Sequence, residues 1–550
     1  MISFEYKGFV KVGGLGEAVG NLSKALARKG YKIHVLIPSH GVQKKQTPHR
    51  KLKLLVNYKG SKCTVAVHEF LSDSVHVLLF YGEGGLAARV LNDPIVYGEN
   101  IFDKIALISR CIPELLGRLM VKGGHHIIHA HDWHAIPIAL SLYNELKQLG
   151  AKPTLVLQIH LYCATEVSLD YLINECGLGN FEYLVYIAGR TKNLKLSEIH
   201  RGAKGILEKI GAYIADVIVT VSKSYLMEDE ECLLSMIGWK FRNKSTYAYN
   251  GCDWKQEDLL QRVMKIHGTA LKALYGSEID RATLKDYLLK KALKLPQEEP
   301  IITDKKVRDF IYSFKKKPYI GHGRVMPFKR SGIMILTTGR ATHQKGLDVL
   351  LSSIDRVIKY IPDARFLLLL IPLRDELDII KDIMEFCCDH EKHVRAIFGL
   401  TPSIFHLSHL ASDIFAIPSR WEPFGIVALE AMATGNVIVA SKVGGLKETI
   451  LDIRDYRDKG TGLLVPKEDS KGLADAIITL ASLLKISEGK LSYFKKVRIP
   501  EIRELVKENP SLFKVMRENA LRRAEEFRWN KVSNMMISAY KMGINLSSIK

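Results

Sequence analysis

The sequence has no long apolar run. The longest, Phe366–Ile371, is far shorter than the roughly 18–20 residues that cross a membrane as a helix. No segment has the form of a signal peptide either. The run is typical of a strand that is buried on both faces of a parallel sheet. We therefore expect no membrane partner.

Cysteine is scarce and follows no pattern. The eight cysteines include no CxxC pair and no regular spacing, and two of them, Cys387 and Cys388, are adjacent. Disulfide frameworks and cysteine-based metal modules need regular spacing. The pattern favours free thiols and predicts a cytoplasmic protein.

The sequence has fewer acidic than basic residues. The chain has 59 Asp and Glu against 80 Lys and Arg, which gives a formal net charge of +21. Such a balance fits nucleic-acid binding, an anionic substrate, or a lysine-rich composition such as thermophiles use. The basic residues are spread along the chain apart from Lys315–Lys317, and no signature of a nucleic-acid module is present. We expect no nucleic-acid partner, and the charge leaves homo-oligomerisation open.

Strand-like and helix-like segments alternate along 550 residues, which is enough for two or more domains. This alternation predicts an α/β fold with doubly wound parallel sheets. Ile2–Glu5 would be the end of a first strand, which is either short or begins late. In the first half we expect helices at Gly20–Lys29 and Ile105–Met120. The clearest strands there are Lys32–Ile37, His76–Phe80, Ile127–His129, Thr154–Ile159 and Val217–Val221.

Two segments of the first half carry candidate ligand groups. Lys11–Gly16 (KVGGLG) is a glycine-rich turn before a helix, where the backbone can approach an anion closely. His129–His134 (HAHDWH) and His160 both follow predicted strands, so their polar groups should meet at the carboxyl edge of one sheet. Three histidines and Asp132 leave a metal site open, but no second ligand cluster supports it. We therefore expect no metal, and a buried structural role remains open for His160.

The second half repeats the alternation from about Ser331. Its strand Ile333–Thr337 ends in a loop that carries Arg340 and Lys345, and a helix follows from Leu347. Two cations between a strand and a helix can converge on a diphosphate. Two solvated surface cations are the alternative. Further strands are expected at Phe366–Ile371, Ala396–Phe398, Ile414–Ile417 and Val437–Ala440.

Ser419–Glu430 (SRWEPFGIVALE) joins the strand Ile414–Ile417 to a helix expected at Ile426–Thr434. The turn at Gly425 and Ile426 presents unpaired backbone N–H groups to an anion. Glu422 and Glu430 flank the turn and can accept hydrogen bonds from sugar hydroxyls. The stretch thus fits a nucleotide sugar, although an ordinary turn with two solvated glutamates is the alternative. A second glycine-rich turn, with Gly444 and Gly445, follows closely.

A DxD triplet is absent from the chain. A nucleotide-sugar enzyme without one must neutralise its leaving diphosphate with cations and helix dipoles rather than a bridging metal. Arg340, Lys345 and the helix start at Gly425 would serve. We therefore expect no cofactor and no required metal.

Several motifs, taken in order, resemble the glycogen and starch synthases. They are KVGGLGEAVGNLSKAL, HAHDWHAIPIAL, YNGCD, the Thr338–Lys345 loop, RWEPFGIVALEAM, VGGLKETI and TGLLVP. The match covers both halves of the chain, and the lysine-rich composition is closest to the archaeal members. The resemblance implies the GT-B fold, with two Rossmann-like domains that face each other across a cleft and close on the substrate.

By this resemblance the domains are 1–325, with a helical insertion at about 254–320, and 326–515. Residues 516–550 would form final helices that pack back on the N-terminal domain. Residues 297–330 match no motif that we can assign.

The implied activity is a retaining hexosyltransferase that moves glucose from ADP-glucose or UDP-glucose to the non-reducing end of an α-1,4-glucan such as glycogen. Arg340 and Lys345 match the family's cations on the diphosphate, and Glu422 matches its carboxylate at the glucose hydroxyls. Glu430 matches a carboxylate that related enzymes place on the ribose. His160 matches the histidine near the glucose 6-hydroxyl and the reacting carbon.

The remaining positions also follow from the resemblance. Lys11, with Gly13, Gly14 and Gly16, matches the loop that closes on the glucosyl donor. Asp132 and Tyr225 match acceptor-side positions. The chain departs from the family at Leu161, where an asparagine is usual, and in its curtailed first strand. A related GT-B transferase with another acceptor is the nearest alternative function, and an inactive glucan- or nucleotide-binding protein is a further one.

Overall fold

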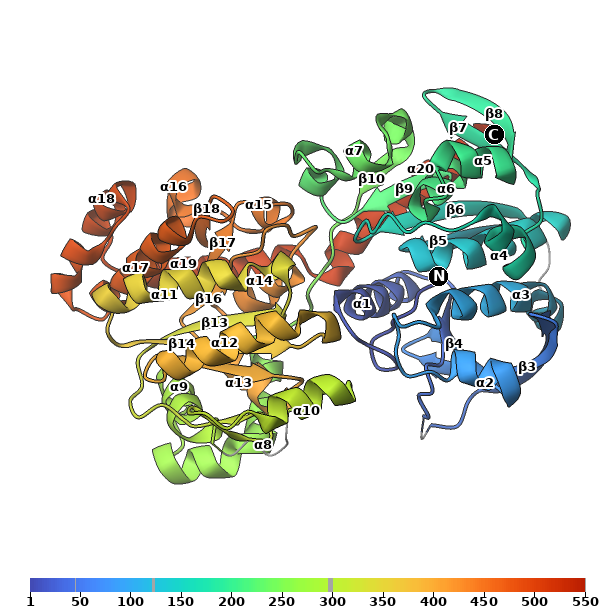
Figure 1. The fold of residues 1–550 in the computed structure, drawn as a ribbon. Helices are drawn as coiled ribbons and strands as arrows, with labels where there is room; N and C mark the ends of the chain where they lie inside the picture. Colours follow the sequence, from blue (N-terminus) through green and yellow to red (C-terminus); the bar gives the residue numbers. More distant parts are fainter. Residues whose placement is uncertain (45, 121–123, 295–299, 550) are drawn as a thin grey trace. The chain divides into compact units, whose positions relative to one another are not determined.

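A computed structural model describes residues 1–44, 46–120, 124–294 and 300–549. The chain folds into two compact units (Figure 1). Unit 1 comprises Met1–Gly251 and Trp529–Lys550, and unit 2 comprises Cys252–Arg528. Among the described residues, no helix has both the length and the apolar character that a membrane crossing requires.

The division between the units lies at residue 251 rather than at the expected residue 325. The helices α8 (Gln256–Tyr275) and α9 (Arg281–Tyr287) pack on α13 (Pro402–Ala411) of unit 2. Arg281 donates to the carbonyl oxygen of Ser412 at 2.5 Å. The segment expected as an insertion into the N-terminal domain therefore belongs to unit 2, although its residues 295–299 lie outside the described ranges.

Unit 1 is built on a mixed sheet. One half has the strand order β1-β4-β3-β2, and the other has the order β10-β9-β6-β5. Strands β5, β6, β9 and β10 are parallel, as is the pair β1 and β4, but β2 and β3 run antiparallel to their neighbours. The antiparallel edge was not expected. The strands are β1 (Ile33–Pro38), β2 (Arg50–Tyr58), β3 (Ser61–Ser72), β4 (Val75–Gly82), β5 (His125–His131), β6 (Lys152–Ile159), β9 (Val217–Thr220) and β10 (Ser245–Tyr247).

The first residues of the chain join the two halves of this sheet. Ile2 forms parallel bridges to Leu36 on one side and to Ala130 on the other. Its N–H donates to His129 O at 2.9 Å, and its carbonyl accepts from His131 N at 3.1 Å. The first strand is therefore present but short, and it occupies the central position of the sheet.

Helices cover the sheet of unit 1. The α1 helix packs on α20, and α20 packs on β6 and β9, so the final helix belongs to unit 1. The rest of the segment 516–550, up to Arg528, was expected to pack there too but belongs to unit 2. Gly543 permits this approach, because a Cβ atom there would lie 2.9 Å from Val217 Cγ1. The main helices are α1 (Gly14–Arg28), α2 (Gly85–Leu91), α3 (Ile101–Leu119), α4 (Ile136–Gln148), α5 (Leu196–Ala203), α6 (Leu207–Ile214), α7 (Leu233–Ile237) and α20 (Trp529–Ile549).

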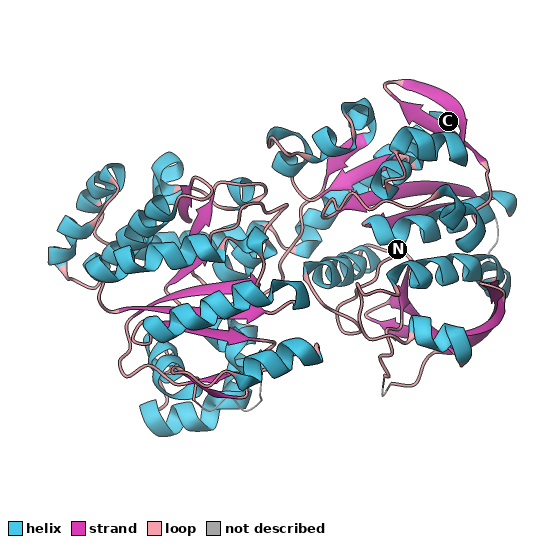
Figure 2. Cartoon of the chain, in the orientation of Figure 1, coloured by secondary structure: helices cyan, strands magenta, loops and turns pink. Residues whose placement is uncertain are grey.

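Unit 2 is a doubly wound parallel sheet, as expected. Its strand order is β15-β14-β13-β16-β17-β18, and every pair is parallel. Buried apolar runs such as Phe366–Leu370 form the interior strands, and helices cover both faces (Figure 2). The strands are β13 (Ile333–Arg340), β14 (Ala364–Ile371), β15 (Val394–Phe398), β16 (Ile414–Ile417), β17 (Val437–Ser441) and β18 (Gly462–Val465).

The helices of unit 2 confirm the expected alternation. The helix expected from Leu347 is α11. The main ones are α10 (Lys305–Ser313), α11 (Leu347–Tyr360), α12 (Leu377–Asp389), α14 (Ile426–Met432), α15 (Leu446–Thr449), α16 (Ile453–Tyr456), α17 (Ser470–Ser487), α18 (Pro500–Glu508) and α19 (Leu512–Glu526).

Candidate functional site

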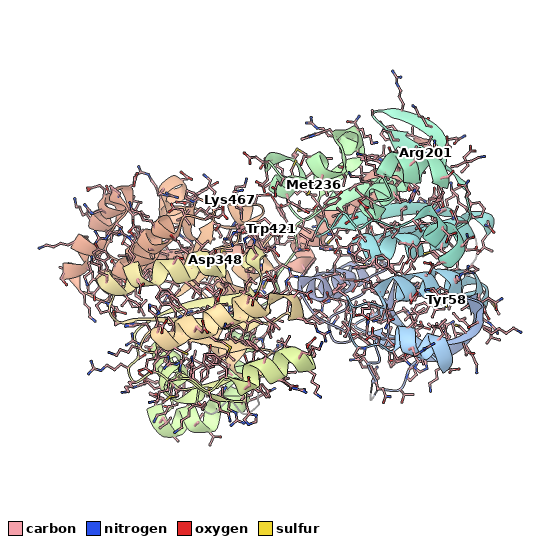
Figure 3. All side chains as sticks on the ribbon, viewed as in Figure 1. Tyr58, Arg201, Met236, Asp348, Trp421 and Lys467 are labelled. Carbon is pink, nitrogen blue, oxygen red and sulfur yellow. The ribbon has the colours of Figure 1, made fainter. Side chains whose placement is uncertain are left out.

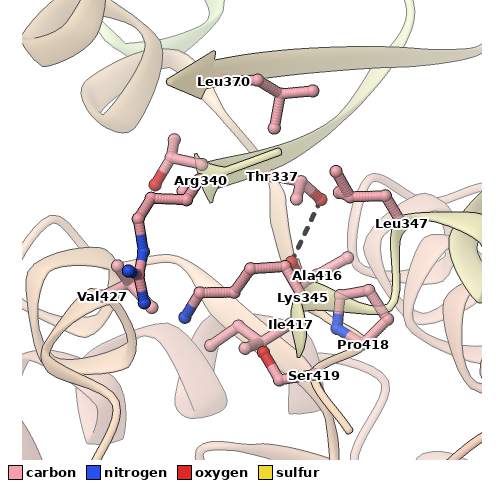
Figure 4. Close-up of a pocket in the computed structure, with 12 residues that line it drawn as sticks. Thr337, Arg340, Lys345, Leu347, Leu370, Ala416, Ile417, Pro418, Ser419 and Val427 are labelled. Atoms are coloured by element: carbon pink, nitrogen blue, oxygen red, sulfur yellow. Dashed lines mark hydrogen bonds between the residues drawn. The ribbon is translucent and has the colours of Figure 1, made fainter. Parts of the chain in front are cut away.

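A pocket lies in unit 2 where the strand order reverses, between β13 and β16. Connections leave the carboxyl ends of these two strands in opposite directions, so a crevice forms there in an open α/β sheet. The pocket is small, with a cavity volume of about 10 Å³, and is partly open to solvent (Figure 4). Its lining includes Thr338, Gly339, Arg340, Lys345, Ser419 and Val427.

The pocket brings the two predicted cations together. Strand β13 continues to Arg340, three residues beyond its expected end, and Lys345 ends a short 3-10 turn. Figure 4 shows the side chains of Arg340 and Lys345 pointing toward each other across the pocket. Arg340 also donates to Gln344 Oε1 at 3.1 Å. Two positive charges at one strand end make this pocket attractive to an anion.

Lys345 binds the predicted sugar carboxylate directly. Its Nζ lies 2.5 Å from Glu422 Oε2, and the two side chains are only 15% and 11% exposed. Ser419 Oγ donates to the same carboxylate oxygen at 3.3 Å. Because the pair is largely buried, solvent and salt screen it little. The two residues expected to hold different parts of one substrate thus hold each other in this structure.

Close backbone packing fixes the position of Glu422. Gly444 has φ +46°, and a Cβ atom there would lie 1.9 Å from Glu422 O. Gly445 N donates to the same carbonyl oxygen at 3.1 Å. The glycines expected to contact a nucleotide sugar therefore lie behind the Glu422 turn. Gly346 likewise permits close backbone packing just before this turn, because a Cβ atom there would lie 2.0 Å from Pro418 O.

The turn after Glu422 opens a short helix. Gly425 has φ +87° and precedes α14, which ends at Met432, two residues before the expected end at Thr434. Ile426 and Glu430 are half-buried on this helix, and Glu430 lies close enough to the Cys252 thiol to contribute to its raised pKa, whose main cause is burial. Ile426 and Glu430 are therefore partly covered by neighbouring residues.

Two neighbouring side chains that the sequence did not single out support the pocket. Gln344 is buried, and its Nε2 donates to Trp421 O at 3.1 Å. Arg420 N donates to Gln344 O at 2.9 Å, and the Arg420 guanidinium binds both oxygens of Asp348 at 2.8 and 2.7 Å. Asp348 and Trp421 mark this region in Figure 3. Gln344 thus ties the loop of Lys345 to the loop of Glu422.

In unit 1 the ends of β5 and β6 lie side by side, as expected. Asp132, which has φ +61°, follows β5, and its Oδ1 accepts from His160 N at 2.6 Å and Leu161 N at 3.3 Å. Burial raises the pKa of Asp132 to about 7, although the two backbone N–H groups oppose that shift. The carboxyl of Asp132 therefore positions the backbone that follows β6.

His160 lies beside a second histidine of the HAHDWH motif. Its Nε2 is 3.1 Å from His131 Nδ1, and the two rings stack with centroids 5.4 Å apart. Burial lowers the pKa of His160 to about 3. Both rings are therefore neutral near pH 7, so one nitrogen of the pair donates and the other accepts.

The other histidines of this motif are buried among protein groups. His129 Nδ1 pairs with Tyr540 OH at 2.9 Å, and the ring of His134 packs on Phe4 with centroids 4.7 Å apart. Within the described ranges, the histidines of HAHDWH do not belong to any group of donors close enough to hold a metal ion.

Two further buried side chains hold the segment after His160. Tyr225 OH accepts from Tyr162 N at 2.9 Å. Glu208 accepts from Cys163 N at 2.9 Å and from Thr165 N at 3.2 Å. Tyr225, expected near an acceptor, lies under this segment with 6% of its surface exposed. Glu208 was missed, because a buried glutamate inside a helix has no distinguishing sequence pattern.

The glycine-rich loop is also held by a carboxylate. Helix α1 begins at Gly14, six residues before its expected start, so Gly14 and Gly16 lie in its first turn. Glu5 Oε2 accepts from both Val12 N and Gly13 N at 2.7 Å. The Lys11 ammonium pairs with Glu17 at 2.6 Å. The loop N–H groups expected to face an anion thus face the buried Glu5, which the sequence analysis also missed.

Comparison with known families places both units. Residues 1–231 match the model of the starch synthase catalytic domain, and residues 332–482 match the model of the glycosyl transferases group 1. Granule-bound starch synthase 2 of Pisum sativum is 25% identical over 492 residues, which cover 87% of this chain and 59% of that protein. A glycogen synthase of Thermosipho melanesiensis is 24% identical over 512 residues, which cover 90% and 93%. The chain spans about three fifths of the length of the plant starch synthases it matches.

Solved structures agree on the fold. The catalytic domain of starch synthase IV from Arabidopsis thaliana superposes with a TM-score of 0.66 at 18% identity, covering 99% of this chain and 98% of that one. The trehalose-6-phosphate synthase OtsA superposes with a TM-score of 0.54 at 12% identity, covering 98% of each chain. The fold is GT-B, with a Rossmann-like sheet in each unit. By the order of its motifs, the two family models and these relatives, the chain is similar to the glycogen and starch synthases.

Proposed function

We propose that the protein is a retaining hexosyltransferase that moves glucose from ADP-glucose or UDP-glucose to the non-reducing end of an α-1,4-glucan. The observation that carries this proposal is the pairing of Lys345 with Glu422 beside Arg340 in the pocket between β13 and β16. Relatives that are named glycogen synthases support the reaction. The Arabidopsis starch synthase IV domain was solved with ADP and acarbose, so ADP-glucose is the first donor to test.

The pocket explains how the diphosphate would be held. Lys345 would leave Glu422 for the diphosphate, and Arg340 would bind the same anion from the opposite side. Glu422 would then accept hydrogen bonds from the glucose hydroxyls. Negative charge grows on the diphosphate as the glycosidic bond breaks, so fixed cations stabilise the transition state more than the bound substrate.

Secondary contributions come from the turn after Glu422. Backbone N–H groups at Gly425 and Ile426 would donate to the diphosphate, while Glu430 would bind the ribose. Helix α14 has only seven residues, so its dipole is a weaker aid than the two side-chain cations. Gly444 and Gly445 would act by holding Glu422 in place.

In unit 1 we propose that His160 binds the glucose 6-hydroxyl as a neutral imidazole. Asp132 and Tyr225 would act on the acceptor side by shaping the segment that follows His160. Lys11 would exchange Glu17 for the glucosyl donor, with Gly13, Gly14 and Gly16 giving close backbone access.

We also propose that no metal is needed for turnover, since the pocket has its own cations. Metal-free catalysis predicts that a chelator leaves the rate unchanged. A reducing compartment such as the cytoplasm is the proposed location. None of the eight cysteines, all within the described ranges, forms a disulfide, which fits that environment.

The test is incorporation of labelled glucose into glycogen from ADP-glucose and, separately, from UDP-glucose, with and without EDTA. We expect incorporation from at least one donor that survives EDTA. Lys345→Ala should lower it by about 10²–10³-fold, while Lys467→Ala, at an exposed lysine outside the pocket, should leave it unchanged. Absence of incorporation from both donors by a protein that still binds ADP would overturn the glucan synthase assignment.

A different acceptor is the second candidate. The chain shares its fold with a sucrose-phosphate synthase at a TM-score of 0.52 and with OtsA at 0.54. The net charge of +21 also suits an anionic acceptor. Transfer to glucose 6-phosphate or fructose 6-phosphate, with none to glycogen, would select this alternative.

A further inference from the structure

Three metal-binding side chains converge in unit 1, away from the ends of β5 and β6. They are His34 on β1, Glu69 on β3 and His76 on β4. Each offers one ligand atom, and these atoms all lie within 4.8 Å of one another. Among the described residues, no other group of three or more histidine, cysteine, aspartate or glutamate side chains comes this close together.

Strand register explains the convergence. His34 and His76 are direct partners on the parallel strands β1 and β4, so their side chains stand on one face about one strand spacing apart. On β3, Leu71 lies opposite His76, and Glu69 is two residues away on the same face. The three side chains are therefore fixed by the backbone of three neighbouring strands.

The local contacts prepare these groups as ligands. The two histidine rings stack with centroids 4.8 Å apart, and His76 Nδ1 lies 2.6 Å from Glu69 Oε1. Arg50 binds the other oxygen, Oε2, at 2.8 Å. The side chain of Glu69 is only 4% exposed, whereas both histidines remain partly accessible. An ion could therefore reach the histidines and find an oriented carboxylate behind them.

We propose that His34, Glu69 and His76 form a binding site for a divalent transition-metal ion such as Zn²⁺. Two imidazoles and one carboxylate are a ligand set that such ions prefer, and water would complete a tetrahedral shell. Mg²⁺ and Ca²⁺ prefer oxygen ligands, so they are poor candidates. Arg50 would remain on Glu69 Oε2 and orient the carboxylate from outside the shell.

Binding requires small side-chain rotations. Metal–ligand bonds of about 2.0–2.2 Å place the donors of a tetrahedral site roughly 3.4 Å apart. The most widely spaced donors, at most 4.8 Å apart, would therefore close in by about 1.4 Å. His76 Nδ1 and Glu69 Oε1, now 2.6 Å apart, would move apart by about 0.8 Å. The ion would replace any proton that His76 shares with Glu69, so binding should weaken as the pH falls.

The position of the site predicts a structural role. His34 and His76 are each the second residue of a strand, so they lie near the amino ends of β1 and β4. The groups proposed for catalysis in unit 1 follow the carboxyl ends of β5 and β6. An ion here would join three strands and leave those groups untouched.

The experiment titrates chelator-treated full-length protein with ZnCl₂ and follows heat by calorimetry and the unfolding temperature by fluorescence. We expect one equivalent of Zn²⁺ to bind and to raise the unfolding temperature by several degrees. His76→Ala and Glu69→Gln should each weaken binding at least tenfold. His68→Asn is the matched control, because His68 is a half-buried histidine on the same sheet outside the group, and it should bind as the wild type does.

A second measurement keeps the test valid if a variant misfolds. Co²⁺ added to the wild-type protein should give the visible absorption of a tetrahedral site with nitrogen and oxygen ligands, and Zn²⁺ should displace it. The proposal is overturned if the wild type binds no stoichiometric Zn²⁺, or if folded His76→Ala binds Zn²⁺ as tightly as His68→Asn does. Glucosyl transfer by the metal-free protein is expected to be unchanged, so this outcome is independent of the proposed function.

Discussion

The two units build their candidate sites in opposite ways. In unit 2, Arg340 and Lys345 line a pocket with their charged side chains, and Glu422 pairs with Lys345 beside it. In unit 1, Asp132, Glu208 and Glu5 are buried carboxyls whose oxygens accept backbone N–H groups. A carboxylate thus pairs with a side-chain cation in one unit and binds backbone N–H groups in the other. Substitutions should separate these two uses.

The largest effect is expected at Lys345. Lys345→Ala removes a cation from the diphosphate and should lower kcat by about 10²–10³-fold, as the loss of one fixed transition-state contact does elsewhere. Affinity for glycogen should change little, because the side chain faces the donor pocket. Steady-state kinetics with ADP-glucose and a glycogen-binding assay measure the two. An unchanged kcat would show that the diphosphate is neutralised elsewhere.

Asp132 should show its burial in the pH dependence of stability. Its pKa is raised to about 7 in the folded protein, against about 4 when unfolded. The folded state therefore binds more protons between these values, and the free energy of unfolding should fall as pH rises from about 4 to 7. The full loss would be about 4 kcal/mol for three pH units.

Asp132→Asn should lack this pH dependence. Chemical denaturation of both proteins at several pH values measures the difference between their free energies of unfolding. A difference that stays constant between pH 4 and pH 7 would mean that Asp132 is ionised throughout, held by the N–H groups of His160 and Leu161.

Gly444 tests the turn that carries Glu422. Gly444→Ala adds a Cβ atom 1.9 Å from Glu422 O at φ +46°, and we expect a loss of about 2–3 kcal/mol in stability with a lower kcat. Gly489→Ala is the control, because its φ is +86° but a Cβ there would meet nothing within 4 Å. Equal unfolding temperatures and rates for the two variants would exclude the proposed support.

Glu208 should give the smallest effect. Cys163 N and Thr165 N donate to different oxygens of Glu208. Glu208→Gln keeps one acceptor oxygen and loses one of these two hydrogen bonds, so we expect a loss of about 1 kcal/mol in stability. If Glu208 supports the segment after His160, its substitution should change kcat more than KM. Glu208→Ala should lower kcat further, and Glu208→Asp should recover part of it. A kcat that is the same in all three variants would show that this segment does not contribute to turnover.

Patterns in the sequence located the unit 2 site because its side chains directly follow strands. Ile333 and Ile414 begin apolar runs that end just before Arg340 and Ser419, and parallel strands bring such ends to one edge. The expected domain boundary at residue 325 was wrong, because it depends on packing between segments that are distant in the sequence. The helices α8 and α9 have no periodicity that says which sheet they cover, and their packing on α13 decides it.

The sequence by itself determined the alternating α/β order, the strand-end positions of Arg340, Lys345, Asp132 and His160, and the resemblance to the glycogen and starch synthases. These features depend on local periodicity and on short motifs. Tertiary structure alone decided that Lys345 binds Glu422, that Glu5 holds the glycine-rich loop, and that His34, Glu69 and His76 meet. Such contacts join residues up to 77 positions apart, and strand order and register, which no local pattern encodes, set them.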